Sequence, residues 1–261
     1  MKDEGDVKLE QEIHGRRWAA MHGGYFSDPA KAAALIKNLR AAVLAQKPAV
    51  VADLGGGTGF ILSLLAKNLK NSAPQLVNVD MSRRQTCECP SPGIKCINTG
   101  FEELRRKDLL GDRTGPLLLT MRSVLHYAPG KNSCGSLLRH IRKLCQPGEY
   151  FVHQSACFET RQDAALMDRI FRLLGTHKHY TTERGLQAML EDCGWEVLKS
   201  VRAPQLIFTA DDERLRYGID DRKVAEICRA VGNSGSSSAK ARASRDFTGF
   251  FKYRIFVCRA R

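Results

Sequence analysis

Hydrophobic and polar positions along the chain fall into blocks whose period changes several times. Residues 49–54, AVVADL, form a short, continuous apolar run with β-branched side chains, which is typical of a strand buried on both faces. Residues 28–46 and 60–69 carry apolar residues at helical spacing, and Asp28 followed by Pro29 is a good helix start. Between the run and the second helix lies DLGGGTG. The pattern therefore predicts helix, strand, tight glycine turn and helix.

The alternation of strand and helix continues along the rest of the chain. Short apolar runs predict further strands at residues 74–80, 93–98, 116–125, 149–156, 195–203 and 250–260. Helical spacing predicts helices at residues 100–110, 136–145, 163–174 and 183–193. Strands separated by helices form parallel sheets through right-handed crossovers. We expect an α/β fold with a seven-stranded, mostly parallel sheet and helices on both faces.

Two segments depart from this plan. Residues 1–47 are predicted to be an N-terminal helical lid segment, and residues 48–261 the main domain. An insertion at about 204–246 precedes the last strand and contains a predicted helix at 222–231. The Gly/Ser-rich stretch that follows cannot bury enough apolar surface to offset the entropy of ordering it. We therefore expect residues 232–245 to be mobile.

Composition narrows the class of protein without choosing a function. The chain has 261 residues, 43% hydrophobic and 26% charged, and no apolar run approaches the roughly 20 residues that span a bilayer. Its first residues are mixed in charge and resemble no secretory signal, so a soluble, cytoplasmic protein without a membrane partner is expected. A formal net charge of +13 favours anionic partners, whether phosphates, nucleic acid or acidic membrane surfaces, and does not choose among them.

Nine cysteines are spread over the chain, and most are expected to be reduced core thiols. Cys87, Cys89 and Cys96 lie close together in CECPSPGIKC, but paired CxxC ligands and a fourth candidate are absent from the sequence. We therefore predict no metal site and interpret this stretch as a loop with free thiols.

The glycine turn predicts a ligand held close to the backbone. In an open parallel sheet, ligands bind beyond the carboxyl ends of the strands, where the first glycine turn lies. A side chain at Gly55, Gly57 or Gly59 would block that approach or require strained backbone. Asp80 ends the second strand, where a carboxylate can accept hydrogen bonds from ribose hydroxyls. A nicotinamide oxidoreductase would share this spacing, although the usual GxGxxG is not matched.

The acidic residue before the turn separates these alternatives. Asp53 followed by Gly55, Gly57 and Gly59 resembles the first motif of class I S-adenosylmethionine-dependent methyltransferases, an acid followed by GxGxG, and the resemblance extends over about residues 49–200. It implies a Rossmann-like sheet and S-adenosylmethionine as the cofactor. It also implies a set of cofactor-binding residues, which comprises Asp53, Gly55, Gly57, Gly59, Asp80, Met81, Phe101, Glu102 and Arg122. In this set Phe101 and Glu102 stand where the family often places an aspartate near the adenine; the alternative interpretations are a core side chain for Phe101 and a helix-start charge for Glu102.

Methyl transfer requires alignment and, for a protonated nucleophile, removal of a proton. His177 and His179, in LGTHKHYTT between two predicted helices, are the first candidates for the base, and exposed loop histidines are the alternative interpretation. His153, near the end of a strand, is a third candidate or a core histidine. The residues predicted to contact the substrate are Tyr25, Phe26, His126 and Tyr180. The aromatic residues near Tyr25, Trp18 among them, either form a lid or attach the leading segment to the core.

The residues after the fourth strand exclude two classes of methyl acceptor. The chain has neither a [DN]PP[YF] tetrapeptide nor a Pro-Cys nucleophile after the fourth strand, where MRSV stands instead. We expect methylation of an O, N or S atom of a small metabolite, and an anionic metabolite would suit the basic chain. RNA or protein methylation is the alternative, and a noncatalytic binding subunit is a third. A homodimer is compatible with the sequence.

Overall fold

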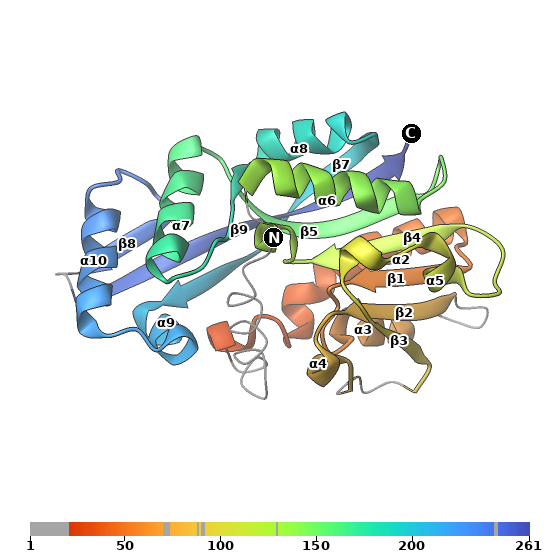
Figure 1. Cartoon of the computed structure of the whole chain (residues 1–261), viewed down its shortest axis with the longest axis horizontal. Helices are drawn as coiled ribbons and strands as arrows, with labels where there is room; N and C mark the ends of the chain where they lie inside the picture. The colour runs from red at the N-terminus through yellow and green to blue at the C-terminus, as the bar shows by residue number, and fades with distance from the viewer. Residues whose placement is uncertain (1–20, 70–73, 88, 90–91, 129, 243–244) are drawn as a thin grey trace.

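The computed structural model describes residues 21–69, 74–87, 89, 92–128, 130–242 and 245–261. Its centre is a mixed sheet in which seven strands follow the order β3-β2-β1-β4-β5-β9-β7, with β6 paired to β5 and β8 paired to β9 (Figure 1). The strands are β1 Val50–Leu54, β2 Gln75–Asp80, β3 Ile94–Asn98, β4 Leu117–Arg122, β5 Tyr150–Phe158, β6 Thr181–Thr182, β7 Trp195–Thr209, β8 Ala239–Arg242 and β9 Asp246–Ala260. The predicted Rossmann-like sheet is confirmed on its main path, and two short strands are added to it.

Strands β1 to β5 are parallel to one another, whereas β9 runs antiparallel to both β5 and β7. All residues of β1 and β4 are buried, because helices cover both faces of the sheet. The helices are η1 Met21–Gly24, α2 Pro29–Gln46, α3 Phe60–Asn68, α4 Arg83–Cys87, η2 Phe101–Glu103, α5 Arg106–Leu110, η3 Leu125–Tyr127, α6 Gly130–Leu144, α7 Arg161–Leu173, α8 Glu183–Asp192, α9 Ala210–Tyr217 and α10 Asp221–Gly232. The single helix predicted over 100–110 is in fact η2 and α5, separated by two residues.

Two apolar clusters hold the helices to the sheet. One cluster joins α2 and α3 to one face through side chains such as Leu35, Leu39 and Leu62. The other joins α6 and α8 to the opposite face through Leu138, Leu190 and similar residues. These two layers fix the carboxyl ends of β1, β2 and β4 at one edge of the sheet.

A third apolar cluster forms a lobe beyond that edge. Strands β7 and β9 are each 15 residues long and extend past β5, where they carry α7, α9, α10 and β8 (Figure 1, left). The cluster is rich in aromatic side chains, including Phe171, Phe208 and Phe251. Strand β7 continues to Thr209, beyond the predicted end at residue 203, so the inserted segment between the two long strands covers residues 210–245.

The predicted mobility of residues 232–245 is wrong for most of that stretch. Buried Asp163 accepts hydrogen bonds from the Ser236 hydroxyl at 2.5 Å and from the Ser237 backbone N–H at 3.0 Å. Residues 239–242 then form β8, which pairs with β9. The serines are therefore held by a buried carboxylate, an attachment that their low-complexity composition does not reveal.

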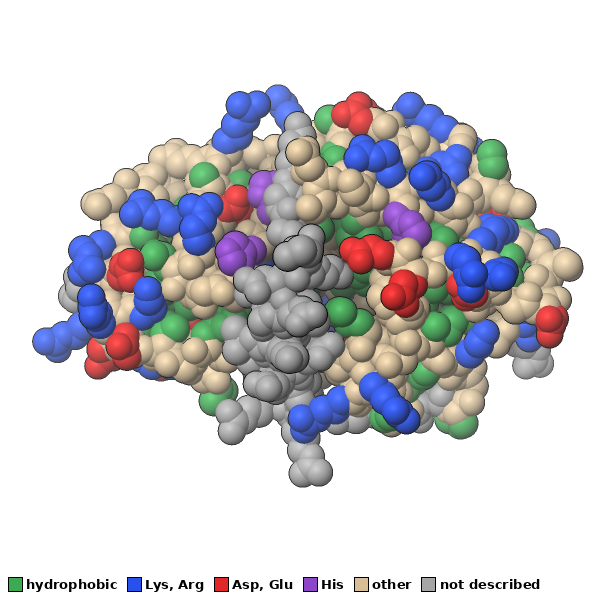
Figure 2. All heavy atoms as spheres, in the orientation of Figure 1, with side chains coloured by type: hydrophobic (Ala, Val, Ile, Leu, Met, Phe, Trp, Pro, Cys, Tyr) green, Lys and Arg blue, Asp and Glu red, His purple; other side chains and the backbone are tan. Residues whose placement is uncertain are grey.

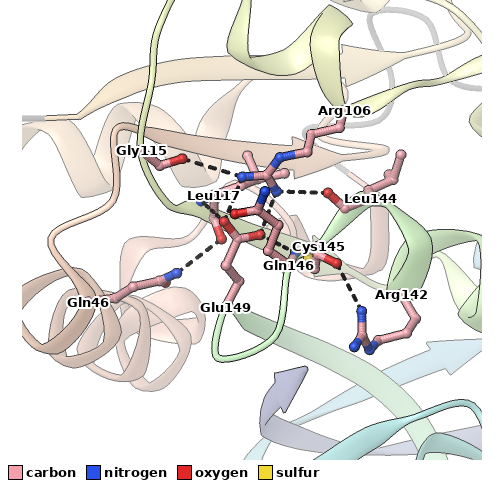
Figure 3. Close-up of polar contacts among 9 residues, drawn as sticks. All are labelled: Gln46, Arg106, Gly115, Leu117, Arg142, Leu144, Cys145, Gln146 and Glu149. Atoms are coloured by element: carbon pink, nitrogen blue, oxygen red, sulfur yellow. Dashed lines mark hydrogen bonds and ion pairs between the residues drawn. The ribbon is translucent and has the colours of Figure 1, made fainter. Parts of the chain in front are cut away.

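An ion pair between buried Glu149 and partly exposed Arg106 fastens the opposite edge of the sheet (Figure 3). Glu149 precedes β5, and its carboxylate binds both terminal nitrogens of Arg106 at 2.5 and 2.7 Å. The same carboxylate accepts the backbone N–H groups of Leu117 at 2.8 Å and Gln146 at 2.7 Å. The arrangement links α5, the start of β4 and the turn before β5.

None of the described helices combines the length and the hydropathy that crossing a bilayer requires.

Candidate active site

The turn between β1 and α3 is shaped by glycines. Gly55, Gly57 and Gly59 have φ values of +72°, +56° and +76°, which side-chain-bearing residues rarely adopt. Gly56, which the motif does not single out, is the most confined: a Cβ there would lie 2.1 Å from Asn78 Oδ1. The turn therefore presents bare backbone at the carboxyl edge of the sheet, followed by the N-terminus of α3.

Asp53, the penultimate residue of β1, is 1% exposed beneath this turn. Burial raises its pKa to about 7, the negative charge of Asp80 adds to the rise, and Arg122 opposes it. Its Oδ1 atom is buried and has no hydrogen-bond partner among the described residues. A buried carboxylate oxygen without a donor, next to bare backbone, fits the ammonium of an aminoacyl group.

Asp80 ends β2 and organises the turn from the side. Its Oδ2 atom accepts the Gly57 N–H at 2.9 Å, and its Oδ1 atom accepts the Ser82 N–H at 2.8 Å. These contacts hold the half-buried carboxylate at the edge where ribose binding was predicted. Met81, next to it, has an exposed side chain.

The two predicted adenine contacts lie in η2, after β3. The Phe101 ring approaches Gly55, with its Cζ atom 3.4 Å from the position that a Cβ on that glycine would take. The ring also packs against the core cluster under α6. Glu102 is exposed in the same short helix. Phe101 is thus beside the turn, and the roles of both residues toward adenine stay predictions.

Arg122 ends β4 and holds the segment that contains Tyr25 and Phe26. Its terminal nitrogens donate to the backbone carbonyls of these residues at 3.1 and 3.2 Å, and its guanidinium lies 5.3 and 5.4 Å from their ring centroids. The Tyr25 hydroxyl donates to the Pro204 carbonyl at 2.6 Å. Arg122 therefore fastens residues 25–26 against the carboxyl edge of the sheet. Residues 1–20 of the predicted lid, Trp18 included, lie outside the described residues.

Sequence reasoning missed a buried tyrosine at this edge. Tyr253, on β9, lies 2.6 Å from the Ser123 hydroxyl and stacks on Tyr25 at 5.6 Å. Ser123 directly follows β4 and has a φ of +61°, a conformation that costs energy for a serine. Burial raises the pKa of Tyr253 to about 12. No local pattern marks Tyr253, because its role depends on the antiparallel pairing of β9 with β5.

His153 does not belong to the site. It is fully buried between the rings of Phe151 and Phe256, at 4.5 and 5.2 Å, and its Nδ1 atom pairs with the Ser155 hydroxyl at 2.8 Å. Burial lowers its pKa to about 3. A histidine sealed in the core cannot take a proton from a substrate, so its prediction as a base is wrong.

His179 lies beside the site with a partner that the sequence did not indicate. Its Nδ1 atom is 3.1 Å from Asp168 Oδ2, and its backbone N–H donates to the His126 carbonyl at 3.0 Å. Asp168 Oδ1 also accepts the Tyr180 N–H at 2.7 Å. Asp168, on α7, thereby fixes the loop and one ring nitrogen of His179.

The other predicted loop residues take different positions. The Tyr180 ring is buried and stacks on His126, in η3 directly after β4, with centroids 5.5 Å apart. Burial raises the pKa of Tyr180. His177 is exposed on the same loop. The structure thus brings His126, His179 and Tyr180 together and leaves His177 at the surface.

The cysteines of the predicted free-thiol loop lie near the turn. Cys89 Sγ is 2.7 Å from the position of a Cβ on Gly59, so this thiol packs against the glycine backbone. In the part of the chain that the structure describes, all nine cysteines are free and no cluster of His, Cys, Asp or Glu is arranged to hold a metal.

Comparisons with known proteins bear on the fold and the family of this chain. A family model described as a methyltransferase domain matches residues 27–200. No curated protein matches the chain. Among solved structures, a Bacillus halodurans protein with a provisional methyltransferase assignment has 14% identity and a TM-score of 0.68 over 87% of this chain and 98% of its own. The YcgJ protein of Bacillus subtilis has 12% identity and a TM-score of 0.66 over 88% and 99%.

A third solved structure is that of 1,6-didemethyltoxoflavin-N1-methyltransferase from Burkholderia thailandensis, with bound 1,6-didemethyltoxoflavin and S-adenosylhomocysteine. It has 15% identity and a TM-score of 0.55 over 100% of this chain and 91% of its own. At these identities the structures show a shared fold. The family model covers two thirds of the chain and includes the glycine turn, Asp80 and Arg122. The chain therefore belongs to the class I methyltransferases, the enzymes that use S-adenosylmethionine.

Proposed function

We propose that this enzyme methylates an O, N or S atom of a small molecule, with His179 as the base where the nucleophile carries a proton. The observation that carries the proposal is the His179–Asp168 pair at 3.1 Å, on a loop attached to the His126 carbonyl just after β4. A histidine with one ring nitrogen bound to a carboxylate keeps the other for proton transfer near neutral pH.

The residues at the carboxyl edge divide the remaining tasks. When bound, the cofactor supplies the electrophilic methyl group. Asp53 would receive its ammonium, the glycine backbone its aminoacyl portion and Asp80 its ribose hydroxyls. Tyr25 and Phe26, held by Arg122, would exclude water on one side, and Tyr180 with His126 would line the acceptor side. His179 would take the proton from the acceptor's O, N or S atom when that atom receives the methyl group.

A small acceptor is supported by the aromatic side chains that lie at this edge, Tyr25 and Phe26 from the N-terminal segment and Tyr180 from the loop after α7. The 1,6-didemethyltoxoflavin-N1-methyltransferase, which has the same fold, holds 1,6-didemethyltoxoflavin in its solved structure. The formal charge of +13 favours RNA as the second candidate acceptor. A cytoplasmic location and a homodimer stay predictions from the sequence.

The test is to incubate the purified enzyme, methyl-labelled S-adenosylmethionine and a cell extract, and to separate products by size. We expect label in the small-molecule fraction. His179→Ala should reduce labelling on the order of 100-fold or more, the usual contribution of a general base, while affinity for S-adenosylhomocysteine stays unchanged. His177→Ala, an exposed histidine of the same loop, is the matched control and should behave like the parent.

Each alternative outcome has its own meaning. Label in nuclease-sensitive material would favour RNA, and label in protein would favour a protein acceptor. Equal labelling by the His179→Ala enzyme would remove this residue as the base. If the purified chain gives no calorimetric heat with S-adenosylhomocysteine and labels no fraction, the proposed function as a whole is contradicted.

A further inference from the structure

Two buried cations lie on the lobe side of the site and share the same pair of tyrosines. Lys178 is 7% exposed, and its Nζ atom lies 2.8 Å from the Tyr217 hydroxyl and 5.0 Å from the Tyr127 ring centroid. Arg216 is 8% exposed; its Nη2 atom lies 3.4 Å from the Tyr127 hydroxyl and its guanidinium 5.0 Å from the Tyr217 ring centroid. The two charges therefore converge, although they come from a loop and from α9.

Helix α9 is built to point Arg216 inward. At its start, the Thr209 hydroxyl accepts the Asp212 N–H at 3.2 Å and the Asp212 carboxylate accepts the Thr209 N–H at 2.8 Å. At its end, Gly218 has a φ of +63°, and its N–H donates to the Arg214 carbonyl at 2.9 Å. Both ends are thus fixed. The helix buries Glu213 and Arg216, three residues apart, and leaves Leu215 exposed.

This distribution is the reverse of what stability alone favours. Burying an ionised side chain costs several kcal/mol before its partners offset the loss, whereas burying a leucine is favourable. An inserted helix that exposes its leucine and buries a glutamate and an arginine has placed charge where packing would prefer apolar residues. The aromatic rings around Lys178, including Phe171 at 4.6 Å, lower the cost of holding its charge away from water.

The cluster of Lys178, Arg216 and their two tyrosines adjoins His179, the proposed base, and the carboxyl edge of the sheet. Lys178 immediately precedes His179, and Tyr127 follows His126, whose carbonyl accepts the His179 N–H. Burial raises the pKa of the Tyr180 hydroxyl, the charge of Glu213 raises it further, and the charge of Arg216 lowers it. Burial also raises the pKa of Tyr253, which the charges of Arg122 and Arg216 both lower. Arg216 of α9 therefore acts on the same buried tyrosine as Arg122, which ends β4.

We propose that Lys178 and Arg216 bind a carboxylate of the methyl acceptor, with Tyr127 and Tyr217 flanking its planar part. The inference rests on the proposed small-molecule methyltransferase function and deepens it. A guanidinium fork and an ammonium at a desolvated site match a carboxylate in charge and geometry. Because α9 lies outside the segment that the family model matches, this contact makes the inserted helix a specificity element of this enzyme.

The probes are 3,4-dihydroxybenzoate and its neutral isostere 3,4-dihydroxybenzamide, which differ by one charge and both carry hydroxyls that can accept a methyl group. Binding of each to the enzyme saturated with S-adenosylhomocysteine is measured by calorimetry. We expect the benzoate to bind at least tenfold more tightly than the benzamide. Lys178→Met and Arg216→Met should each remove most of that preference while affinity for S-adenosylhomocysteine stays unchanged.

Arg214→Met, on the same helix, is the matched control, since this arginine pairs with Asp211 and Asp221 away from the cluster. Arg216→Lys keeps the charge and loses the fork, so it tests the geometry if the methionine variants fail to fold. Equal binding of the two probes, binding of neither, or a preference that survives both methionine variants would overturn the inference. Absence of heat with S-adenosylhomocysteine itself would instead contradict the proposed function.

Discussion

Replacing Asp53 with asparagine should make the ligand-free enzyme more stable while it weakens cofactor binding. The pKa of Asp53 rises from 3.8 to about 7, and its side chain is almost fully buried, so solvent screening does not reduce the effect. Three pH units at about 1.4 kcal/mol each amount to about 4 kcal/mol. Below the unfolded pKa both states are protonated and the penalty vanishes. It grows as pH rises and is complete above the folded pKa.

The assay is urea unfolding of the parent and the Asp53→Asn enzyme at several pH values. The variant should be more stable by about 2 kcal/mol near pH 5 and by about 4 kcal/mol near pH 8. His153, which also makes stability depend on pH, is present in both proteins, so its effect cancels in the difference. Affinity for S-adenosylhomocysteine should fall at least tenfold, because an amide cannot pair with the ammonium as a carboxylate does.

Two results would refute this reasoning. A stability difference that does not change with pH would show that Asp53 carries no shifted pKa. Unchanged affinity for S-adenosylhomocysteine would show that the unpartnered Oδ1 atom does not face the aminoacyl group. Either result can occur without the other, so the electrostatic argument and the binding argument are tested separately.

Three further predictions address the edges of the sheet and its core. Asp80→Ala should lower the affinity for S-adenosylhomocysteine on the order of 100-fold in calorimetry, and unchanged affinity would remove Asp80 from the ribose site. Glu149→Ala should lower the free energy of urea unfolding by about 2 to 3 kcal/mol with cofactor affinity intact, because the buried Leu117 N–H loses its acceptor and the partly exposed Arg106 loses its partner; a loss under about 1 kcal/mol would contradict the importance of this carboxylate. Since the pKa of His153 falls from 6.5 to about 3, stability should decline as pH drops below 6.5, and His153→Leu should remove that part of the decline.

The central sheet could be predicted because its signals are local. A continuous apolar run such as residues 50–54 can satisfy its backbone and bury both faces only within a covered sheet. The glycine turn needs left-handed backbone that few other residues adopt, so its place at the end of β1 follows from residue type. Parallel topology then brings Asp53 and Asp80 to one edge, whatever the details of packing.

The lobe and the acceptor side could not be predicted in this way. The burial of β7 follows no regular alternation, and its pairing with β9 shifts register between Val197 and Lys199 and between Ala203 and Leu206. Asp168 contacts His179 and Tyr180 across the loop that follows α7, and Tyr253 contacts Ser123, 130 positions away; neither residue lies in a local pattern. For His153 the sequence left two interpretations, a base and a core histidine, and the structure confirms the second; because β5 is buried on both faces, alternation along the strand could not decide between them.

The position of β9 between β5 and β7 has a consequence for how the molecule folds. Among the described strands, β7 pairs with β9 alone, so β7 cannot join the sheet until residues 246–260 are in place. Loop closure over the inserted segment 210–245 must come first, and contacts that span such separations form slowly. Until then the edge of β5 presents unpaired backbone, which is a template for association with other chains. Mutations that slow the ordering of the insertion should therefore reduce the yield of soluble enzyme before they affect its activity.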